Sequence, residues 1–246
     1  MEGVPRDRED ELLLARISEA AGRERLGRRC ATYRAVASLA CAPGGPGAPI
    51  RKVWRAVAAV VGRSRGSVEG RGTAVGGRLD FYERGMTVAV RGRIHVVRYD
   101  STSVLQRAEP CPQGVARSCA LTDVDGEHVV LRRGYFGDPE AWEAEIRRAV
   151  VDAQVPRALA ALAQGARLTY GPVWLTGQEV GSGELSTRWP LIQRIAVRHG
   201  SIAVRVAGQW QVLGTLVSEI PNILVLRALA EHLAGIPPVG AEPGDD

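Results

Sequence analysis

The predicted fold rests on the stretch from Gly76 to Val104, GGRLDFYERGMTVAVRGRIHVVRYDSTSV. A shortened copy of it runs from Gly171 to Ile195 as GPVWLTGQEVGSGELSTRWPLIQRI. Both stretches pass from an apolar strand through a turn glycine, Gly85 or Gly177, into further strand-like residues. Each then reaches an arginine followed by an aromatic residue: Arg98-Tyr99 in the first copy and Arg188-Trp189 in the second. Such internal similarity predicts one structural unit used twice.

Short β runs separated by glycine turns surround both stretches, and the Asp125-Gly126 pair is the strongest hairpin signal in the sequence. Each set of strands precedes a helix. Asp138 and Pro139 predict the start of the first helix and Gly165 its end, with Pro156 expected to kink or restart it. Asn222 is the expected cap of the second helix, which Gly235 ends.

Several antiparallel strands followed by one helix, twice over, resemble the pleckstrin-homology (PH)-like superfold, including GRAM-type domains. The residues that carry the resemblance are the turn glycines and the aromatic steps RYDSTSV and RWPLIQRI. The GGRL opening at 76–79 and the Pro221-Asn222 pair also look like an actinobacterial family of unknown function with tandem copies of this unit. The resemblance implies a binding or scaffolding protein and no catalyst.

We therefore expect an α+β protein, mainly antiparallel β, with two PH-like β-sandwich or barrel domains that are each closed by a C-terminal helix. Their predicted limits are 67–165 and 166–236, preceded by a helical N-terminal extension with a Pro/Gly linker at 1–66 and followed by a disordered tail at 237–246. The segment RRCATYRAVASLA within the extension fits either a strand or a second helix.

Positive charge is concentrated just before the first copy. The chain has a net charge of +5, and residues 51–71 alone hold six basic residues against Glu69. Residues 50–61 predict an amphipathic helix, with Trp54 on its apolar face and three basic residues off that face: Arg51, Lys52 and Arg55. Packing of this helix on the protein's own sheet is one interpretation; docking on an anionic membrane or an acidic partner is the other.

The turns of the first copy add a second basic group, Arg84, Arg91 and Arg93, which the second copy lacks. We interpret these three, with Arg51, Lys52 and Arg55, as candidate anion- or membrane-binding residues and Trp54 as a candidate partner-binding residue. Arg98 and Arg188 fit a structural role better, with the arginine stem packed on the neighbouring aromatic ring.

The sequence predicts no cofactor, metal site or catalytic constellation. Its four cysteines and four histidines are dispersed and lack the spacing of metal ligands. P-loop and GxSxG motifs are absent. His95 fits a solvent-facing or hydrogen-bonded residue on a strand, while Asp123 and Asp125 flank a turn where such residues serve the backbone.

The leading hypothesis is a non-catalytic, cytoplasmic binding protein whose partner is a protein or an anionic membrane surface, the latter placing it at the membrane periphery. No run of about 18 apolar residues indicates a membrane-spanning helix. The alternatives are a nucleic-acid-binding protein that uses residues 51–71 and an enzyme with an unrecognised site. Oligomeric state is not predicted.

Overall fold

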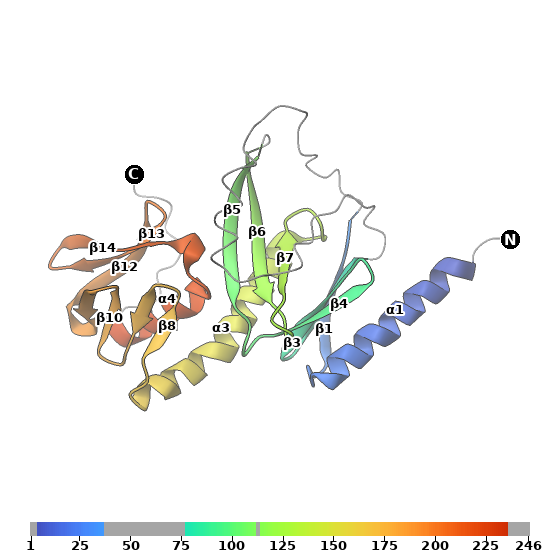
Figure 1. Cartoon of the computed structure of the whole chain (residues 1–246), viewed down its shortest axis with the longest axis horizontal. Helices are drawn as coiled ribbons and strands as arrows, with labels where there is room; N and C mark the ends of the chain where they lie inside the picture. The colour runs from blue at the N-terminus through green and yellow to red at the C-terminus, as the bar shows by residue number, and fades with distance from the viewer. Residues whose placement is uncertain (1–3, 37–76, 112–113, 236–246) are drawn as a thin grey trace. The chain divides into compact units, whose positions relative to one another are not determined.

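The computed structural model describes residues 4–36, 77–111 and 114–235, and within them the protein is α+β with antiparallel sheets (Figure 1). The chain divides into two compact units. The first comprises residues 1–102 and 107–145, and the second comprises residues 103–106 and 146–246. The predicted boundary at 165/166 lies just past the end of helix α3, whereas the division at 145/146 lies within that helix.

The first sheet of the first unit is a four-stranded meander in the order β1-β2-β3-β4. Its strands are β1 (Arg29–Arg34), β2 (Arg78–Tyr82), β3 (Gly85–Val90) and β4 (Arg93–Arg98). The segment RRCATYRAVASLA, which fits either a strand or a helix by sequence, contains strand β1. Strand β1 pairs with β2, and 43 residues separate the two strands in sequence. Of these, residues 37–76 lie outside the described chain. The predicted amphipathic helix at 50–61 falls in that part of the chain.

The two faces of this meander are covered differently. One face carries fully buried apolar side chains: Leu79, Phe81, Met86, Val88 and Val97. The other face lies under helix α1 (Val4–Arg23), which contacts β3 and β4. Ala21 of this helix and Leu26, which follows it, pack against Tyr82 and Val96 of the sheet. Helix α1 therefore belongs to the fold of the first unit.

A second, three-stranded sheet has the order β5-β6-β7, with strands β5 (Val104–Cys111), β6 (Gly114–Thr122) and β7 (His128–Arg132). Helix α3 (Pro139–Ala163) follows, and Asp138 caps it as predicted, because its Oδ1 accepts the Ala141 N–H at 3.1 Å. The helix continues through Pro156 without restarting. Trp142, at the start of α3, is fully buried with Leu121, Leu131 and Phe136.

The order of four strands, three strands and a helix then occurs a second time along the chain, from β8 to α4. The first of these sheets has the order β11-β10-β9-β8 and the second the order β12-β13-β14. The strands are β8 (Leu168–Tyr170), β9 (Val173–Leu175), β10 (Glu179–Ser182), β11 (Leu185–Arg188), β12 (Ile192–Arg198), β13 (Ser201–Val206) and β14 (Gln209–Leu216). The short helices η1 (Trp189–Leu191) and η2 (Val217–Glu219) precede β12 and follow β14.

Helix α4 (Ile223–Ala234) completes the second unit and buries Val225, Leu226 and Leu229. Gly235 ends it in the left-handed conformation, as predicted. The predicted cap Asn222 stands at the N-cap position, but its side chain does not cap the helix. Its Oδ1 instead accepts the Val104 N–H at 2.7 Å and its Nδ2 donates to Gln154 Oε1 at 2.9 Å.

The aromatic residues of the two Arg-aromatic pairs occupy matching positions. Tyr99 directly follows β4 and Trp189 directly follows β11, the fourth strand of each unit, and each is 2% exposed. The Trp189 indole donates to the Thr176 carbonyl at 2.9 Å. The aromatic step of the repeat is therefore a buried anchor at the corner between the two sheets of a unit.

Candidate functional site

The predicted binding residues do not form one group in the structure. Arg51, Lys52, Trp54 and Arg55 lie outside the described residues. Arg84 lies in the β2–β3 turn and Arg91 in the β3–β4 turn, at opposite ends of the six-residue strand β3, which corresponds to about 20 Å. The structure therefore does not bring Arg84 together with Arg91 and Arg93 around one small ligand.

Arg93 is already paired. Its Nη2 lies 2.8 Å from Glu127 Oε2, an acidic group of the β6–β7 turn. Arg98 is paired as well: it donates two hydrogen bonds to Asp100, at 3.1 and 2.9 Å, and one to the Glu24 carbonyl. The hydrogen bond to Asp100 is the main reason that the pKa of Arg98 is raised. Arg98 is thus structural, as expected, but through a carboxylate partner.

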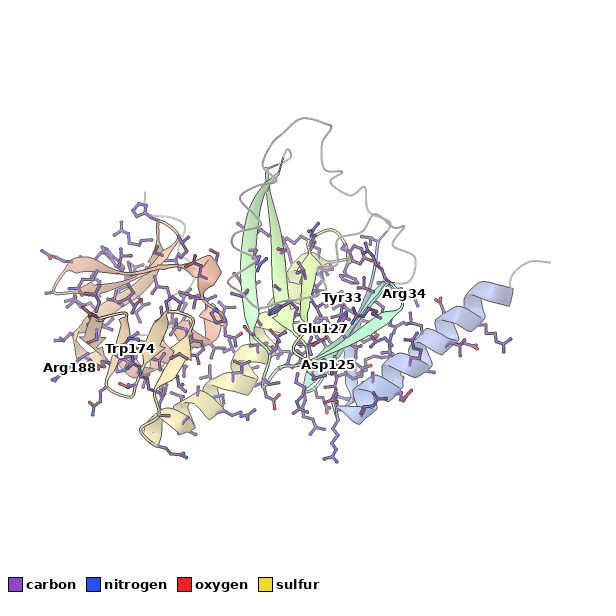
Figure 2. The ribbon with its side chains drawn as sticks, in the orientation of Figure 1. Tyr33, Arg34, Asp125, Glu127, Trp174 and Arg188 are labelled. Carbon is purple, nitrogen blue, oxygen red and sulfur yellow. The ribbon has the colours of Figure 1, made fainter. Side chains whose placement is uncertain are left out.

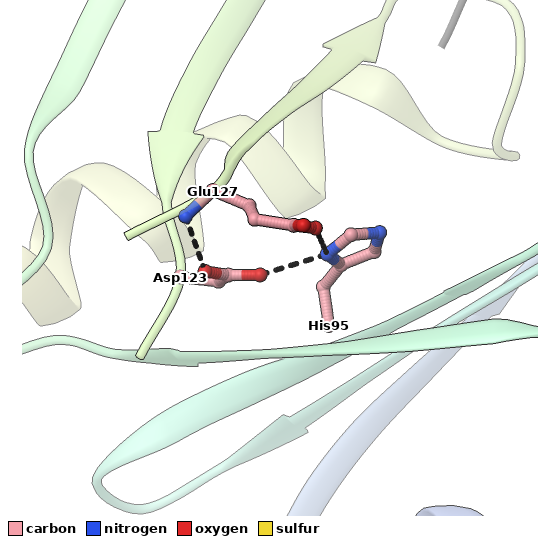
Figure 3. Close-up of side chains that lie close together, drawn as sticks. All are labelled: His95, Asp123 and Glu127. Carbon is pink, nitrogen blue, oxygen red and sulfur yellow. Dashed lines mark hydrogen bonds and ion pairs between the residues drawn. The ribbon is translucent and has the colours of Figure 1, made fainter. Parts of the chain in front are cut away.

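The β6–β7 turn brings two acidic side chains to a histidine from a different sheet (Figure 3). His95 lies on β4 opposite Val88, on the apolar face of the first sheet. Its Nδ1 is 2.8 Å from Asp123 Oδ2 and 3.8 Å from Glu127 Oε2. The expectation of a hydrogen-bonded histidine is confirmed, but its two carboxylate neighbours were not predicted. They are about 30 residues away in sequence, and no local spacing links them to His95.

The same turn fixes the Asp123 carboxylate. Its other oxygen, Oδ1, accepts the backbone N–H groups of Asp125 at 3.0 Å and Glu127 at 2.8 Å, the bonding expected of an aspartate that organises a turn. The Val124 N–H donates to the Val96 carbonyl at 2.9 Å and thereby joins the turn to strand β4. Asp125 and Glu127, both labelled in Figure 2, are the more exposed acidic residues of this turn.

A second charged cluster in the first unit is enclosed by the fold. Asp80 on β2 is fully buried and accepts bonds from Arg78 Nε at 2.6 Å, Arg78 Nη2 at 2.9 Å and Thr32 Oγ1 at 2.5 Å. The bond to Asp80 is the largest cause of the raised pKa of Arg78. Every oxygen of this carboxylate is thus used within the sheet, which indicates a structural role.

The second unit carries a different kind of charged surface, on its three-stranded sheet. Strand register places Arg194 directly opposite Arg205 and Arg205 opposite Trp210. Side chains alternate between faces along a strand, so the same face also holds Arg198 and Val212, while Ile202, Val204 and Leu213 are buried on the other. We call this surface the arginine face: Arg194, Ala196, Arg198, Ser201, Ala203, Arg205, Trp210 and Val212.

Cation–π stacking organises the arginine face. The Arg198 guanidinium lies over the Trp210 ring at 5.0 Å from its centroid. These residues come from the two outer strands of the sheet, so their side chains meet across β13, where Ala203 is fully buried. The small alanine leaves the space in which arginine and tryptophan meet.

The strands that form the arginine face, and the residues between them, contain no acidic residue. Residues 185–218 contain no Asp or Glu. Like charges directly opposite on adjacent strands are destabilising, and Arg194 and Arg205 form such a pair. Two aliphatic residues beside them are half exposed, Val212 at 47% and Leu216, opposite Ser201, at 50%. Arginines on a sheet whose own strands hold no acidic residue, beside exposed aliphatic side chains, are typical of a surface that meets an anionic partner.

The second unit also contains a small hollow between α3, α4 and the start of β5, lined by residues that include Val104, Ile146, Val150 and Ile223. Its volume is about 10 Å³, which is the room needed for one water molecule. This hollow therefore cannot hold a substrate or an organic cofactor.

Comparison with known proteins gives one match. The family described as "Family of unknown function (DUF6585)" matches residues 74–235, which covers both strand-and-helix units from β2 to the end of α4. No curated protein matches. No solved structure matches.

Proposed function

The chain belongs to the DUF6585 family, whose function is unknown, and we propose that it is a non-catalytic binding protein. It docks on anionic membranes through the arginine face. The observation that carries this proposal is the group of three arginines on an acid-free sheet, beside exposed aliphatic side chains.

We further propose that both units are PH-like domains. In support, the order of a four-stranded antiparallel meander, a three-stranded antiparallel meander and a helix occurs twice along the chain. The resemblance favours binding or scaffolding over catalysis. In the described residues no helix is both long and apolar enough to cross a bilayer, so membrane association would take place at the surface.

Lipid explains the mixture of groups better than an acidic protein does. Arginine can lay its aliphatic stem along an apolar surface and keep its charge at the headgroups, and Val212 and Leu216 add apolar contact. Each basic residue close to an anionic bilayer contributes about 1 kcal/mol. Three arginines thus supply about 3 kcal/mol, roughly a hundredfold in partitioning. This is weak binding, and it leaves a role for the predicted contacts of Arg51, Lys52 and Arg55.

A nucleic acid is a poorer fit to the same face. Single strands bind where bases stack on open aromatic rings. The ring of Trp210, the aromatic residue of this face, is already stacked under Arg198. The arginine face thus offers charge to a nucleic acid without a free stacking platform.

Liposome co-sedimentation tests the proposal. We expect the full chain to bind vesicles that contain phosphatidylserine, to ignore neutral phosphatidylcholine vesicles, and to release as salt rises. Changing Arg194, Arg198 and Arg205 together to glutamine should reduce binding at least tenfold. The matched control changes three exposed arginines of the first unit, Arg28, Arg117 and Arg132, to glutamine, which alters the net charge equally.

Three results would overturn the proposal: equal binding to neutral vesicles, no binding at low salt, or full binding by the arginine-face variant. A separate variant with glutamine at 51, 52 and 55 tests the contribution predicted for the basic segment. If only that variant loses binding, the membrane contact belongs to the segment and the arginine face has no part in it.

A further inference from the structure

We infer that His95, Asp123 and Glu127 form a binding site for a divalent first-row transition-metal ion such as Zn²⁺ in the first unit (Figure 3). One imidazole nitrogen and one oxygen from each carboxylate lie within 4.8 Å of one another. This site is independent of the arginine face, which lies in the other unit.

The distances suit coordination. Metal bonds to histidine nitrogen and carboxylate oxygen are 2.0–2.2 Å long, so neighbouring ligand atoms around one ion are about 3 to 3.5 Å apart. His95 Nδ1 is 2.8 Å from Asp123 Oδ2 and 3.8 Å from Glu127 Oε2. Both distances come within about 1 Å of that requirement.

The rest of the fold holds the three ligands in place. Asp123 Oδ1 is fixed by two backbone N–H groups, which leaves Oδ2 aimed at His95. The Val124–Val96 backbone bond fixes the turn to the strand that carries His95. Arg93 Nη2 holds the Glu127 carboxylate at 2.8 Å, the kind of outer contact that orients metal-binding carboxylates.

Burial and charge also favour a cation. The side chains of His95 and Asp123 are 7% and 2% exposed, whereas that of Glu127 is 40% exposed, so an ion would enter past Glu127. With a neutral imidazole, the two carboxylates and Arg93 leave a net charge of −1 around Nδ1. A bound ion would replace the Nδ1 hydrogen bond, and the ring proton would lie on Nε2.

The donor set selects the ion. Calcium takes six to eight oxygen ligands, and magnesium keeps several waters, so neither uses an imidazole nitrogen well. A mixed nitrogen and oxygen set suits zinc, cobalt and manganese, with affinity rising from Mn²⁺ through Co²⁺ to Zn²⁺. Three protein ligands leave at least one coordination position for water.

The test titrates Co²⁺ into the full chain after chelator treatment and follows visible absorption, with Zn²⁺ as the competitor. We expect one ion per chain, displacement of Co²⁺ by Zn²⁺, and no effect of Ca²⁺ or Mg²⁺ at the same concentration. In the ¹⁵N spectrum of histidine, Zn²⁺ should shift Nδ1 of His95 and leave the ring proton on Nε2.

Glu127→Gln and His95→Gln should each weaken binding at least tenfold. Glu127 is half exposed, so its variant stays folded and keeps the test valid if the His95 variant does not. Two matched controls come from the same hairpin: Asp125→Asn, outside the donor set, and His128→Gln, whose ring meets Thr122. Absence of Co²⁺ absorption in the folded wild-type chain, or equal binding by Glu127→Gln, would overturn the inference.

Discussion

The two units share an order of strands and helices but cover the outer face of their first sheet in different ways. In the first unit helix α1 lies over that face. Asp80 on the second strand accepts a hydrogen bond from Arg78 of the same strand. In the second unit the second strand carries Trp174 instead, which is labelled in Figure 2. The Arg167 guanidinium lies over its ring, 3.9 Å from the ring centroid. The first copy thus buries a charged pair within its sheet, and the second stacks an arginine on an indole.

This difference shows what the repeat retains. The corner aromatics Tyr99 and Trp189 stay buried in both units, because each unit must turn from its four-stranded sheet into its three-stranded sheet. The outer surfaces are free to diverge. The first unit has surface ion pairs such as Arg93–Glu127 and Arg133–Glu143, while the second places Arg194, Arg198 and Arg205 on one face of a sheet without acidic residues.

Removing the buried charge should give the largest loss of stability. We expect Asp80→Ala to lower the free energy of unfolding by about 3–5 kcal/mol, because Arg78, whose side chain is 13% exposed, would lose its buried partner. Urea denaturation measures this change. Asp100→Ala is the control: Asp100 makes similar bonds to Arg98, but both side chains are about 30% exposed, so we expect about 1 kcal/mol or less. Equal losses would contradict the role of burial.

Replacing Gly85 of the first unit or Gly181 of the second should give losses of stability of intermediate size. A Cβ on Gly181 would lie 2.5 Å from the Trp174 ring and would also meet the Leu185 carbonyl, and a Cβ on Gly85 would meet the Val97 carbonyl. Gly85→Ala and Gly181→Ala should each cost about 1–3 kcal/mol in thermal or urea unfolding. A Cβ on Gly177 would come no closer than 3.5 Å to another group, so Gly177→Ala should be tolerated. A larger effect at Gly177 than at Gly181 would refute this steric explanation.

The smallest expected effect concerns alkaline pH. Burial raises the pKa of Tyr170 from 10.0 to about 12. Because the folded pKa lies above the unfolded value, the contribution of neutral Tyr170 to stability is complete below pH 10 and is lost as the pH rises toward 12. Tyrosinate absorbance and unfolding measured across this range should show the change, and Tyr170→Phe should flatten it. An unchanged profile in that variant would assign the effect to another tyrosine.

Local signals in the sequence predicted much of the fold. Asp138, Gly165 and Gly235 mark helix ends through backbone chemistry that needs no distant partner, and Asp125-Gly126 forms the predicted hairpin. Strand β10 (Glu179–Ser182) is harder to predict, because its sequence lies within GQEVGSGE, whose three glycines are typical of a turn. Gly181 in that strand is required by the neighbouring Trp174 ring, which only the paired strands reveal.

The candidate sites were harder to predict because they depend on register. Arg194 and Arg205 face each other only after a bulge near Ile192, so counting charges along the chain, or inspecting the turns alone, does not find the arginine face. His95 on strand β4 and Asp123 in the β6–β7 turn lie 28 residues apart, and their meeting depends on how the two sheets of the first unit pack. Sequence patterns within one element say nothing about such distant pairs.

The chain's division between the units has a consequence for dissecting the protein. It passes from the first unit to the second at 102/103, returns at 106/107 and passes again at 145/146. Residues 103–106 complete the second unit, and Asn222 exchanges two hydrogen bonds with Val104 there, one of them from its own N–H at 2.8 Å. No single proteolytic cut or truncation therefore yields both units whole. A fragment that starts at 166 lacks Val104 and the α3 residues that pack with α4, and the second unit cannot finish folding on the ribosome before the first has largely been made.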